Sequence, residues 1–137
     1  MEPLSVREEL PVDERLVAPE QRMEILRGAV LMTPPADEPH GTSHTNLAYV
    51  LRAHVAATHV CAVDMLTRTS KDSDFAPDAS IFPLARRPDG GRQLEEIAFE
   101  IVREQWIGVP SEKARELAKR GVRRVFCVVL KKQRVLE

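Results

Sequence analysis

The stretch IAFEIV, residues 97–102, places a carboxylate, Glu100, in the middle of an apolar run. Alternation with a period of two puts Phe99 on one face of a strand and Glu100 on the other, and both faces are otherwise apolar. A central strand that is covered on both sides has this composition. We therefore predict an α/β fold, in which a central mixed β-sheet is flanked by helices and residues 97–102 form a buried strand.

A second carboxylate stands in a similar context in FAPDASIF, residues 75–82. Pro77 opens this strand, where proline is tolerated, and Asp78 follows it directly. Asp78 taken alone is equally compatible with an aspartate that caps its own backbone turn. Two buried carboxylates on neighbouring strands repel each other unless a positive charge lies between them, so Asp78 and Glu100 together predict a Mg²⁺ site.

The remaining segments predict one main domain. We expect an N-terminal arm over 1–21 that is poorly ordered or forms a loosely docked helix, followed by a domain over 22–137. Within that domain we expect a hairpin over 22–32, a loop over 33–41, a helix over 43–58, a strand over 59–69, a turn over 70–74, a loop over 85–93, a helix over 108–121, a strand over 122–130, and a turn into another strand over 131–137. Thr42 or Ser43 would cap the first helix, Ser111 would cap the second, and Gly121 would end it.

Composition narrows the class of protein. The chain has 137 residues, 43% hydrophobic and 30% charged, which is typical of one soluble globular domain. Its net charge of -1 gives no overall attraction to nucleic acid, so a basic surface would have to be local. We expect no membrane segment, a cytoplasmic location, and two reduced thiols at Cys61 and Cys127, buried in apolar segments.

A lysine follows the two carboxylates at the start of the second predicted helix. Lys113 lies four residues before Leu117 and so borders the buried face of that helix. From there it could reach the two carboxylates, and either activate a water molecule or stabilise the charge of a phosphorane-like transition state. In this arrangement a divalent cation polarises a phosphodiester and generates hydroxide near neutral pH.

An Asp after a Pro, a Glu in an apolar strand some twenty residues later, and a nearby Lys resemble the PD-(D/E)XK nuclease superfamily. More narrowly, the chain resembles the Uma-type family of predicted restriction endonucleases, which is bacterial. The matching stretches are MEILRGAVLMTPPADEPHG, the following helix, FAPDASIF, and IAFEIV through SEKARELAKRGVRRVFCVV. They cover roughly residues 22–130.

The resemblance implies a restriction-endonuclease-like core, Mg²⁺- or Mn²⁺-dependent hydrolysis of DNA, and homodimers. It implies that Asp78 and Glu100 bind the metal and that the catalytic lysine is Lys113 on the helix. Glu24 and His40 fall where the family often has a glutamate in the first hairpin and a histidine before the first long helix. The chain departs from the family in having REQWIGVPSEK after Glu100, in place of a Ser-Pro-Ser type turn.

Several of these residues also have simpler interpretations. Glu24 is compatible with an exposed hairpin position and His40 with a surface loop. We interpret His54 as a hydrogen-bonded core histidine, and we expect no metal partner for His44 or His59.

Two basic clusters are compatible either with solvated surface or with phosphate contacts. They comprise Arg86, Arg87 and Arg92 in one loop, and Lys119, Arg120, Arg123 and Arg124 at a helix-to-strand turn. The leading hypothesis is a metal-dependent DNA endonuclease. The alternatives are a catalytically inactive domain that uses the same fold as a binding or oligomerisation scaffold, and a domain that binds a small phosphorylated ligand, for which no Gly-rich loop is present.

Overall fold

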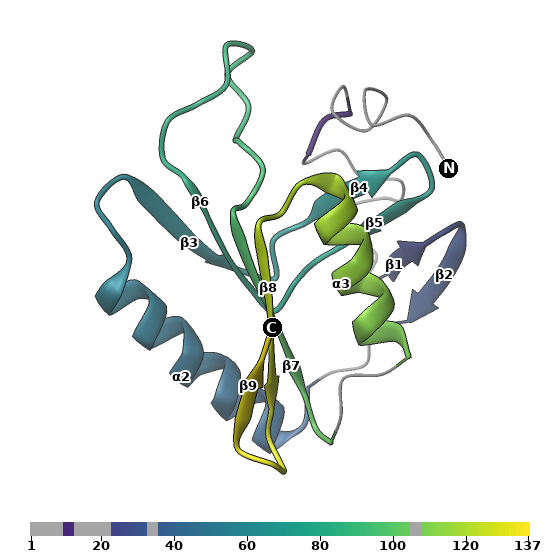
Figure 1. Cartoon of the computed structure of the whole chain (residues 1–137), viewed down its shortest axis with the longest axis vertical. Coiled ribbons are helices and arrows are strands. Elements are labelled where there is room, and N and C mark those ends of the chain that lie inside the picture. Colours follow the sequence, from purple (N-terminus) through teal and green to yellow (C-terminus); the bar gives the residue numbers. More distant parts are fainter. Residues whose placement is uncertain (1–9, 13–22, 33–35, 105–107) are drawn as a thin grey trace.

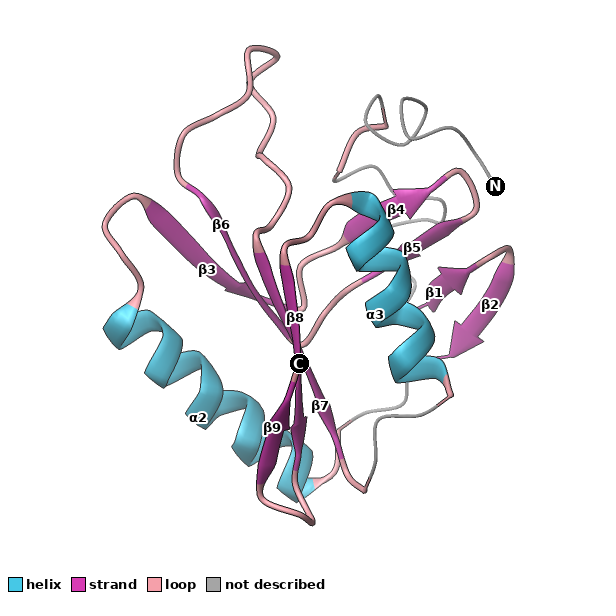
Figure 2. Cartoon of the chain, viewed as in Figure 1, coloured by secondary structure: helices cyan, strands magenta, loops and turns pink. Residues whose placement is uncertain are grey.

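The structure, a computed structural model, describes residues 10–12, 23–32, 36–104 and 108–137. Among them it contains two helices and two β-sheets (Figures 1 and 2). The elements are β1 (Met23–Leu26), β2 (Ala29–Met32), α2 (Glu38–His54), β3 (His59–Val63), β4 (Thr67–Ser70), β5 (Ser73–Phe75), β6 (Ala79–Pro83), β7 (Ile97–Val102), α3 (Val109–Arg120), β8 (Arg124–Val129) and β9 (Arg134–Leu136). No helix in this part of the chain is long and apolar enough to cross a membrane.

The larger sheet has five strands in the order β3-β6-β7-β8-β9. Strands β7 and β8 run parallel and the other pairs are antiparallel, so the sheet is mixed as predicted. Helix α2 lies on one side of it, and α3 with the smaller sheet lies on the other (Figure 1). Strand β7 therefore has both faces covered, which explains why the residues that flank Glu100 in this strand are apolar.

The smaller sheet has the order β2-β1-β5-β4 and differs from the sequence prediction. The predicted hairpin is present over 23–32, with Arg27 and Gly28 at its turn, and residue 22 lies outside the described residues. The single strand expected over 59–69 is instead two strands, β3 and β4, which belong to different sheets. Strand β3 ends at Val63, and the backbone changes direction at Asp64, which adopts a left-handed conformation with φ 49°. The segment predicted as a turn over 70–74 also contributes residues to β4 and β5.

The apolar core lies where α3 packs between the two sheets. Phe75 from β5 and Leu117 from α3 are fully buried, and Ala98 of β7 lies in the same cluster. Gly121 ends α3 with φ 125°, as predicted. Ser111 does not cap the helix; Gly108 does, because Pro110 is accommodated in the first turn and Ser111 already lies inside it.

Helix α2 begins earlier than predicted. Asp37 is its N-cap, and the Asp37 carboxylate accepts a hydrogen bond from the His40 backbone N–H at 3.0 Å. The prolines suggested a loop up to Gly41, but Pro39 stands in the first turn, where no intrahelical N–H is required. His40 is therefore helical. His54, predicted to lie in the core, is exposed in the last turn of the helix.

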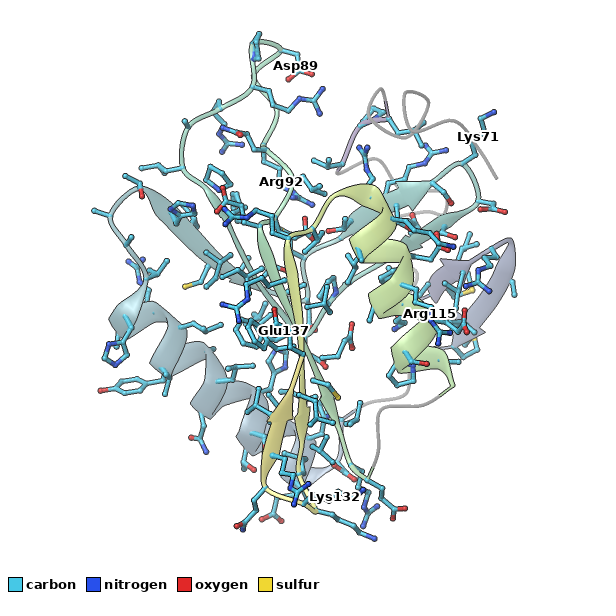
Figure 3. The ribbon with its side chains drawn as sticks, viewed as in Figure 1. Lys71, Asp89, Arg92, Arg115, Lys132 and Glu137 are labelled. Atoms are coloured by element: carbon cyan, nitrogen blue, oxygen red, sulfur yellow. The ribbon has the colours of Figure 1, made fainter. Side chains whose placement is uncertain are left out.

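A buried ionic cluster anchors a short N-terminal segment. Arg92 pairs with Glu95 at 3.1 Å, and its guanidinium also donates to the carbonyls of Leu66 and Val12. Val12 is 3% exposed, so residues 10–12 are docked rather than loose. The other residues of the predicted arm, 1–9 and 13–21, lie outside the described residues. Figure 3 shows Arg92 at the base of the loop that carries Asp89 at its tip.

Candidate active site

Asp78 and Glu100 lie opposite each other on neighbouring chain segments. The register of β6 and β7 pairs Ala79 with Phe99 and Ser80 with Ala98. Continued by one residue, this register brings Asp78, which directly precedes β6, opposite Glu100 on the same face. The structure thus brings together the two carboxylates that the sequence singled out; their role as metal ligands stays a prediction.

Asp78 is held at three points. Its Oδ2 accepts the Ile101 backbone N–H at 2.7 Å, and its Oδ1 lies 3.2 Å from Nε2 of His40. Its own carbonyl accepts a hydrogen bond from Nε2 of His44 at 2.5 Å. The Asp78 carboxylate therefore bonds to the neighbouring strand and to a helix, and the alternative that it caps its own turn receives no support from these contacts.

Glu100 is held much less completely. The residue is 6% exposed, and its Oε1 is buried without a hydrogen-bond partner among the described residues. Burial raises the pKa of Glu100 well above its ordinary range, the positive charge of Lys113 opposes the shift, and the carboxylates of Asp78 and Glu24 add to it. A buried oxygen of this kind beside a second carboxylate fits a hard divalent cation, which takes oxygen ligands.

Lys113 faces the protein interior and bonds to Glu24. Its Nζ lies 2.6 Å from Oε1 of Glu24, and both side chains are largely buried, at 12% and 13% exposure. Oε2 of Glu24 accepts the Ala76 backbone N–H at 2.8 Å, and the Lys113 ammonium also lies over the Phe75 ring. Glu24 is therefore not an exposed hairpin residue. It connects β1 to α3 and to the segment that leads into Asp78.

His40 and His44 extend the site from the side of α2. They are one helical turn apart, and their rings contact edge to face at 6.1 Å. One ring nitrogen from each histidine and one carboxylate oxygen of Asp78 all lie within 4.8 Å of one another. The expectation that His44 has no partner at ligand spacing is therefore wrong. The spacing His-x-x-x-His was visible in the sequence, but the predicted loop over 33–41 placed His40 outside the helix.

Asp64 borders the same region and was not singled out from the sequence. Its side chain reaches solvent, yet partial burial raises the pKa of its carboxyl, nearby His44 opposes this shift, and Asp78 adds to it. Its backbone N–H donates to the Asp78 carbonyl at 3.4 Å. This places a further acidic group beside the histidines.

Other predicted groups lie elsewhere or have structural contacts. His59 bonds to Glu96 at 3.0 Å, away from the carboxylate pair. Arg92 and Arg120 are buried and bind backbone carbonyls, so they are not available as phosphate contacts. Cys61 and Cys127 are free thiols as expected, although Cys61 is only half-buried. Burial and the nearby Glu100 raise the pKa of Cys127 to about 11.

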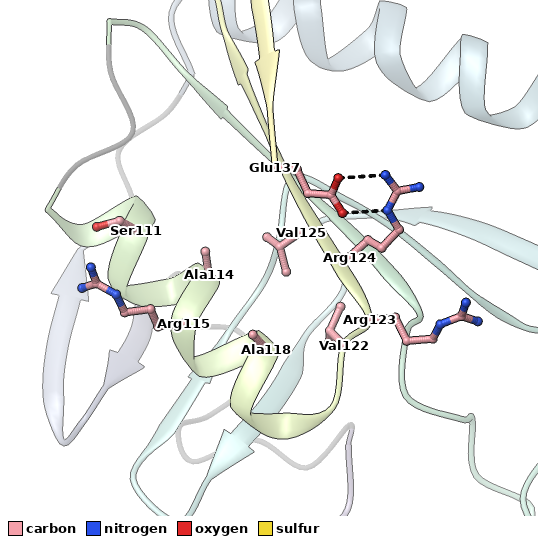
Figure 4. Close-up of a pocket in the computed structure, with 9 residues that line it drawn as sticks. All are labelled: Ser111, Ala114, Arg115, Ala118, Val122, Arg123, Arg124, Val125 and Glu137. Atoms are coloured by element: carbon pink, nitrogen blue, oxygen red, sulfur yellow. Dashed lines mark hydrogen bonds and ion pairs between the residues drawn. The ribbon is translucent and has the colours of Figure 1, made fainter.

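A hollow of about 350 Å³ lies on another side of α3 and does not include the carboxylate pair. Its apolar wall is formed by Ala114, Ala118, Val122 and Val125, and Arg124 at its edge pairs with Glu137 (Figure 4). Neither Lys113 nor any candidate metal ligand is among the residues that line it. We therefore place the candidate active site at the carboxylate pair and not at this hollow.

Comparison with known proteins agrees with this architecture. The crystal structure of a putative nuclease of DUF820 from Anabaena variabilis superposes with a TM-score of 0.68 at 17% identity, covering 88% of this chain and 73% of that one. At this identity the likeness shows the fold alone, a mixed sheet flanked by helices. No curated protein matches the chain. The family profile described as Uma2, putative restriction endonuclease, matches residues 8–136, and the chain therefore belongs to this nuclease family.

Proposed function

We propose that this protein is a metal-dependent endonuclease that hydrolyses phosphodiester bonds in DNA, and that Asp78 and Glu100 hold a divalent cation, Mg²⁺ or Mn²⁺. The observation that carries the proposal is the buried Oε1 of Glu100, which has no partner among the described residues and lies beside a second carboxylate. Folding a carboxylate into such a place costs several kcal/mol unless a cation compensates it. Membership of the nuclease family supports nucleic acid as the substrate.

Each side chain has a distinct role in this proposal. Asp78 is fixed by the Ile101 N–H and by both histidines, so it presents its carboxylate in one orientation. Glu100 supplies the second carboxylate from the adjacent strand. When bound, a divalent cation at this pair lowers the pKa of its water and polarises a phosphodiester oxygen.

Lys113 stabilises the negative charge that develops on the phosphate. Its ammonium is paired with the Glu24 carboxylate, and a protonated lysine suits charge stabilisation better than proton abstraction. Glu24 is a positioning residue, because it ties Lys113 to the Ala76 N–H just before Asp78. The inactive-scaffold alternative gives no reason for a buried Glu100 whose Oε1 has no hydrogen-bond partner among the described residues.

The proposal is tested by metal binding and by cleavage together. Calorimetric titration of the purified protein with Mg²⁺ and with Mn²⁺ should show binding for wild type and Lys113→Ala, and none for Glu100→Gln. With plasmid DNA as substrate, Lys113→Ala should lose about 10²-fold or more of the cleavage rate, the scale of losing one transition-state charge partner. RNA and single-stranded DNA, assayed in parallel, test the choice of substrate.

The matched control is Lys119→Ala, on the same helix. Lys119 is 58% exposed and lies near Glu116 rather than near the carboxylate pair, so this variant should bind metal and cut like wild type. Metal binding that survives Glu100→Gln undiminished, or cleavage that survives it, would place the active site elsewhere. Absence of metal binding by the wild type would favour the inactive scaffold.

A further inference from the structure

The histidine side of Asp78 has a donor that the carboxylate pair alone does not require. Nε2 of His40 lies 3.2 Å from Oδ1 of Asp78. Both side chains are partly buried, at 31% and 14% exposure. A surface histidine needs no such contact, and a carboxylate that served only to bind an oxygen-preferring cation would need no imidazole beside it.

The two histidines are not equivalent. Nε2 of His44 is engaged with the Asp78 carbonyl at 2.5 Å, which orients the backbone at Asp78. His40 instead directs its Nε2 at the carboxylate oxygen itself. In the metal-free protein this nitrogen donates to Oδ1, and with the ring hydrogen on Nδ1 the same nitrogen offers a lone pair.

The observed spacing suits two ligands of one ion. A cation with ligand bonds of about 2.1 Å in octahedral geometry holds adjacent ligand atoms about 3 Å apart. The contact between His40 and Asp78 is close to this value, so an ion could bind both atoms with little movement of either residue. Ligand atoms of His40, His44 and Asp78 lie within 4.8 Å of one another, and the buried, unpaired Oε1 of Glu100, on the strand beside Asp78, is an independent sign that a cation belongs next to this cluster.

We propose that His40 is a nitrogen ligand of the cation held by Asp78 and Glu100, and that the site therefore selects Mn²⁺ over Mg²⁺. This inference rests on the proposed function, because it names the metal class of the same site. Mg²⁺ prefers an all-oxygen shell, whereas first-row transition ions accept imidazole together with carboxylate. His44 is a positioning residue, which acts through the carbonyl of Asp78.

The first test compares affinities for Mn²⁺ and Mg²⁺ by calorimetry. Wild type should bind Mn²⁺ about 10-fold or more tightly than Mg²⁺, and His40→Ala and His40→Gln should lose most of that preference while still binding Mg²⁺. His54→Ala is the matched control, because His54 is an exposed histidine at the far end of the same helix. It should keep the wild-type ratio.

The second test identifies the metal-coordinating histidine directly. Pulsed electron paramagnetic resonance of the Mn²⁺-loaded protein should show coupling to a histidine nitrogen in wild type, in His54→Ala and in His44→Ala, and should lose it in His40→Ala. Coupling that persists in His40→Ala, or that vanishes in His44→Ala instead, would overturn the assignment of the ligand.

The two proposals fail in different ways. If Glu100→Gln abolishes metal binding while His40→Ala leaves the ratio of the two affinities unchanged, the proposed active site stands and the role of His40 is refuted. If the wild type binds neither ion, both proposals are refuted.

Discussion

Replacing Glu100 by Gln should stabilise the metal-free protein. Glutamine has the same shape as protonated glutamate and carries no charge that must be desolvated. The Glu100 side chain is buried, and its Oε1 lacks a hydrogen-bond partner among the described residues. Active sites commonly trade stability for function, and a single stabilising substitution commonly yields about 0.5–2 kcal/mol. For a domain of this size that corresponds to a rise in Tm of roughly 2–8 °C.

The extra stability of metal-free Glu100→Gln over wild type should increase with pH. Burial raises the pKa of Glu100 in the folded state above its ordinary value of 4.5, while the unfolded chain keeps that ordinary value. Below pH 4.5, Glu100 is protonated in both the folded and the unfolded state, so Glu100→Gln is little more stable than wild type. As pH rises further, the unfolded state releases its proton first, so the wild type loses stability until the folded-state pKa is passed. The difference between variant and wild type should therefore be small near pH 4.5 and larger at pH 8.

The assay is urea or thermal unfolding with EDTA present, at pH 5 and pH 8. Glu104→Gln is the matched control: Glu104 is exposed and paired with Lys131, which lowers its pKa, so its replacement should not stabilise the protein. Asp78→Asn should destabilise, by about 1 kcal/mol, because the Asp78 carboxylate already accepts a backbone hydrogen bond and contacts His40.

Saturating Mn²⁺ or Mg²⁺ should make the wild type more stable than Glu100→Gln. A cation that binds only the folded state adds about 2.7 kcal/mol at a hundredfold excess over Kd, and this gain should appear in wild type and not in Glu100→Gln. If Glu100→Gln melts below wild type in EDTA at both pH values, Glu100 is a structural residue and its unpaired oxygen does not indicate a cation site.

Two further predictions concern the scaffold, and urea unfolding measures both. Arg92→Met should lower the free energy of unfolding by about 3–5 kcal/mol, because it leaves Glu95 buried without its charge partner. Arg86→Met, on the exposed part of the same loop, should leave it nearly unchanged. Equal effects of the two substitutions would contradict the structural role of Arg92. Gly121→Ala should destabilise the protein by about 1 kcal/mol or more, because φ at this residue is 125° and the added Cβ would lie 3.3 Å from the Leu94 side chain. Gly41→Ala lies inside α2 with open space around it and should stabilise the protein by about 0.5–1 kcal/mol.

Local patterns in the sequence were sufficient for the elements that combine an apolar period with a clear boundary. IAFEIV forms β7, the Asp after Pro77 stands at the entry to β6, and the helix before Gly121 ends where predicted. Strand β5 gave no such signal, and β4 was predicted only as the end of one strand over 59–69. Their buried positions are largely polar, among them Thr67, Thr69, Ser70 and Ser73, and period-two hydrophobicity cannot find a strand whose inward residues are hydroxyls.

The contacts of the site that were missed are those set by tertiary packing. Glu24 and Lys113 are 89 residues apart, and which face of a four-residue strand points inward is decided by the sheet it joins. The start of α2 was obscured because Pro39 suggests a loop, whereas Asp37 as an N-cap makes the same proline compatible with a first turn. This one boundary error separated His40 from His44 and hid their relation to Asp78.

The distribution of constraints around the carboxylates indicates where the free energy of cation binding would act. Asp78 is already held by a backbone N–H and two imidazoles, from a strand on one side and a helix on the other. Lys113 and Glu24 likewise satisfy each other, with Glu24 also bound to a backbone N–H. Glu100 alone among these groups keeps a buried oxygen with no described partner. An arriving cation would thus find one ligand preorganised and the other destabilised in its absence, so most of the energetic difference between metal-free and metal-bound protein should reside in Glu100 and little in Asp78.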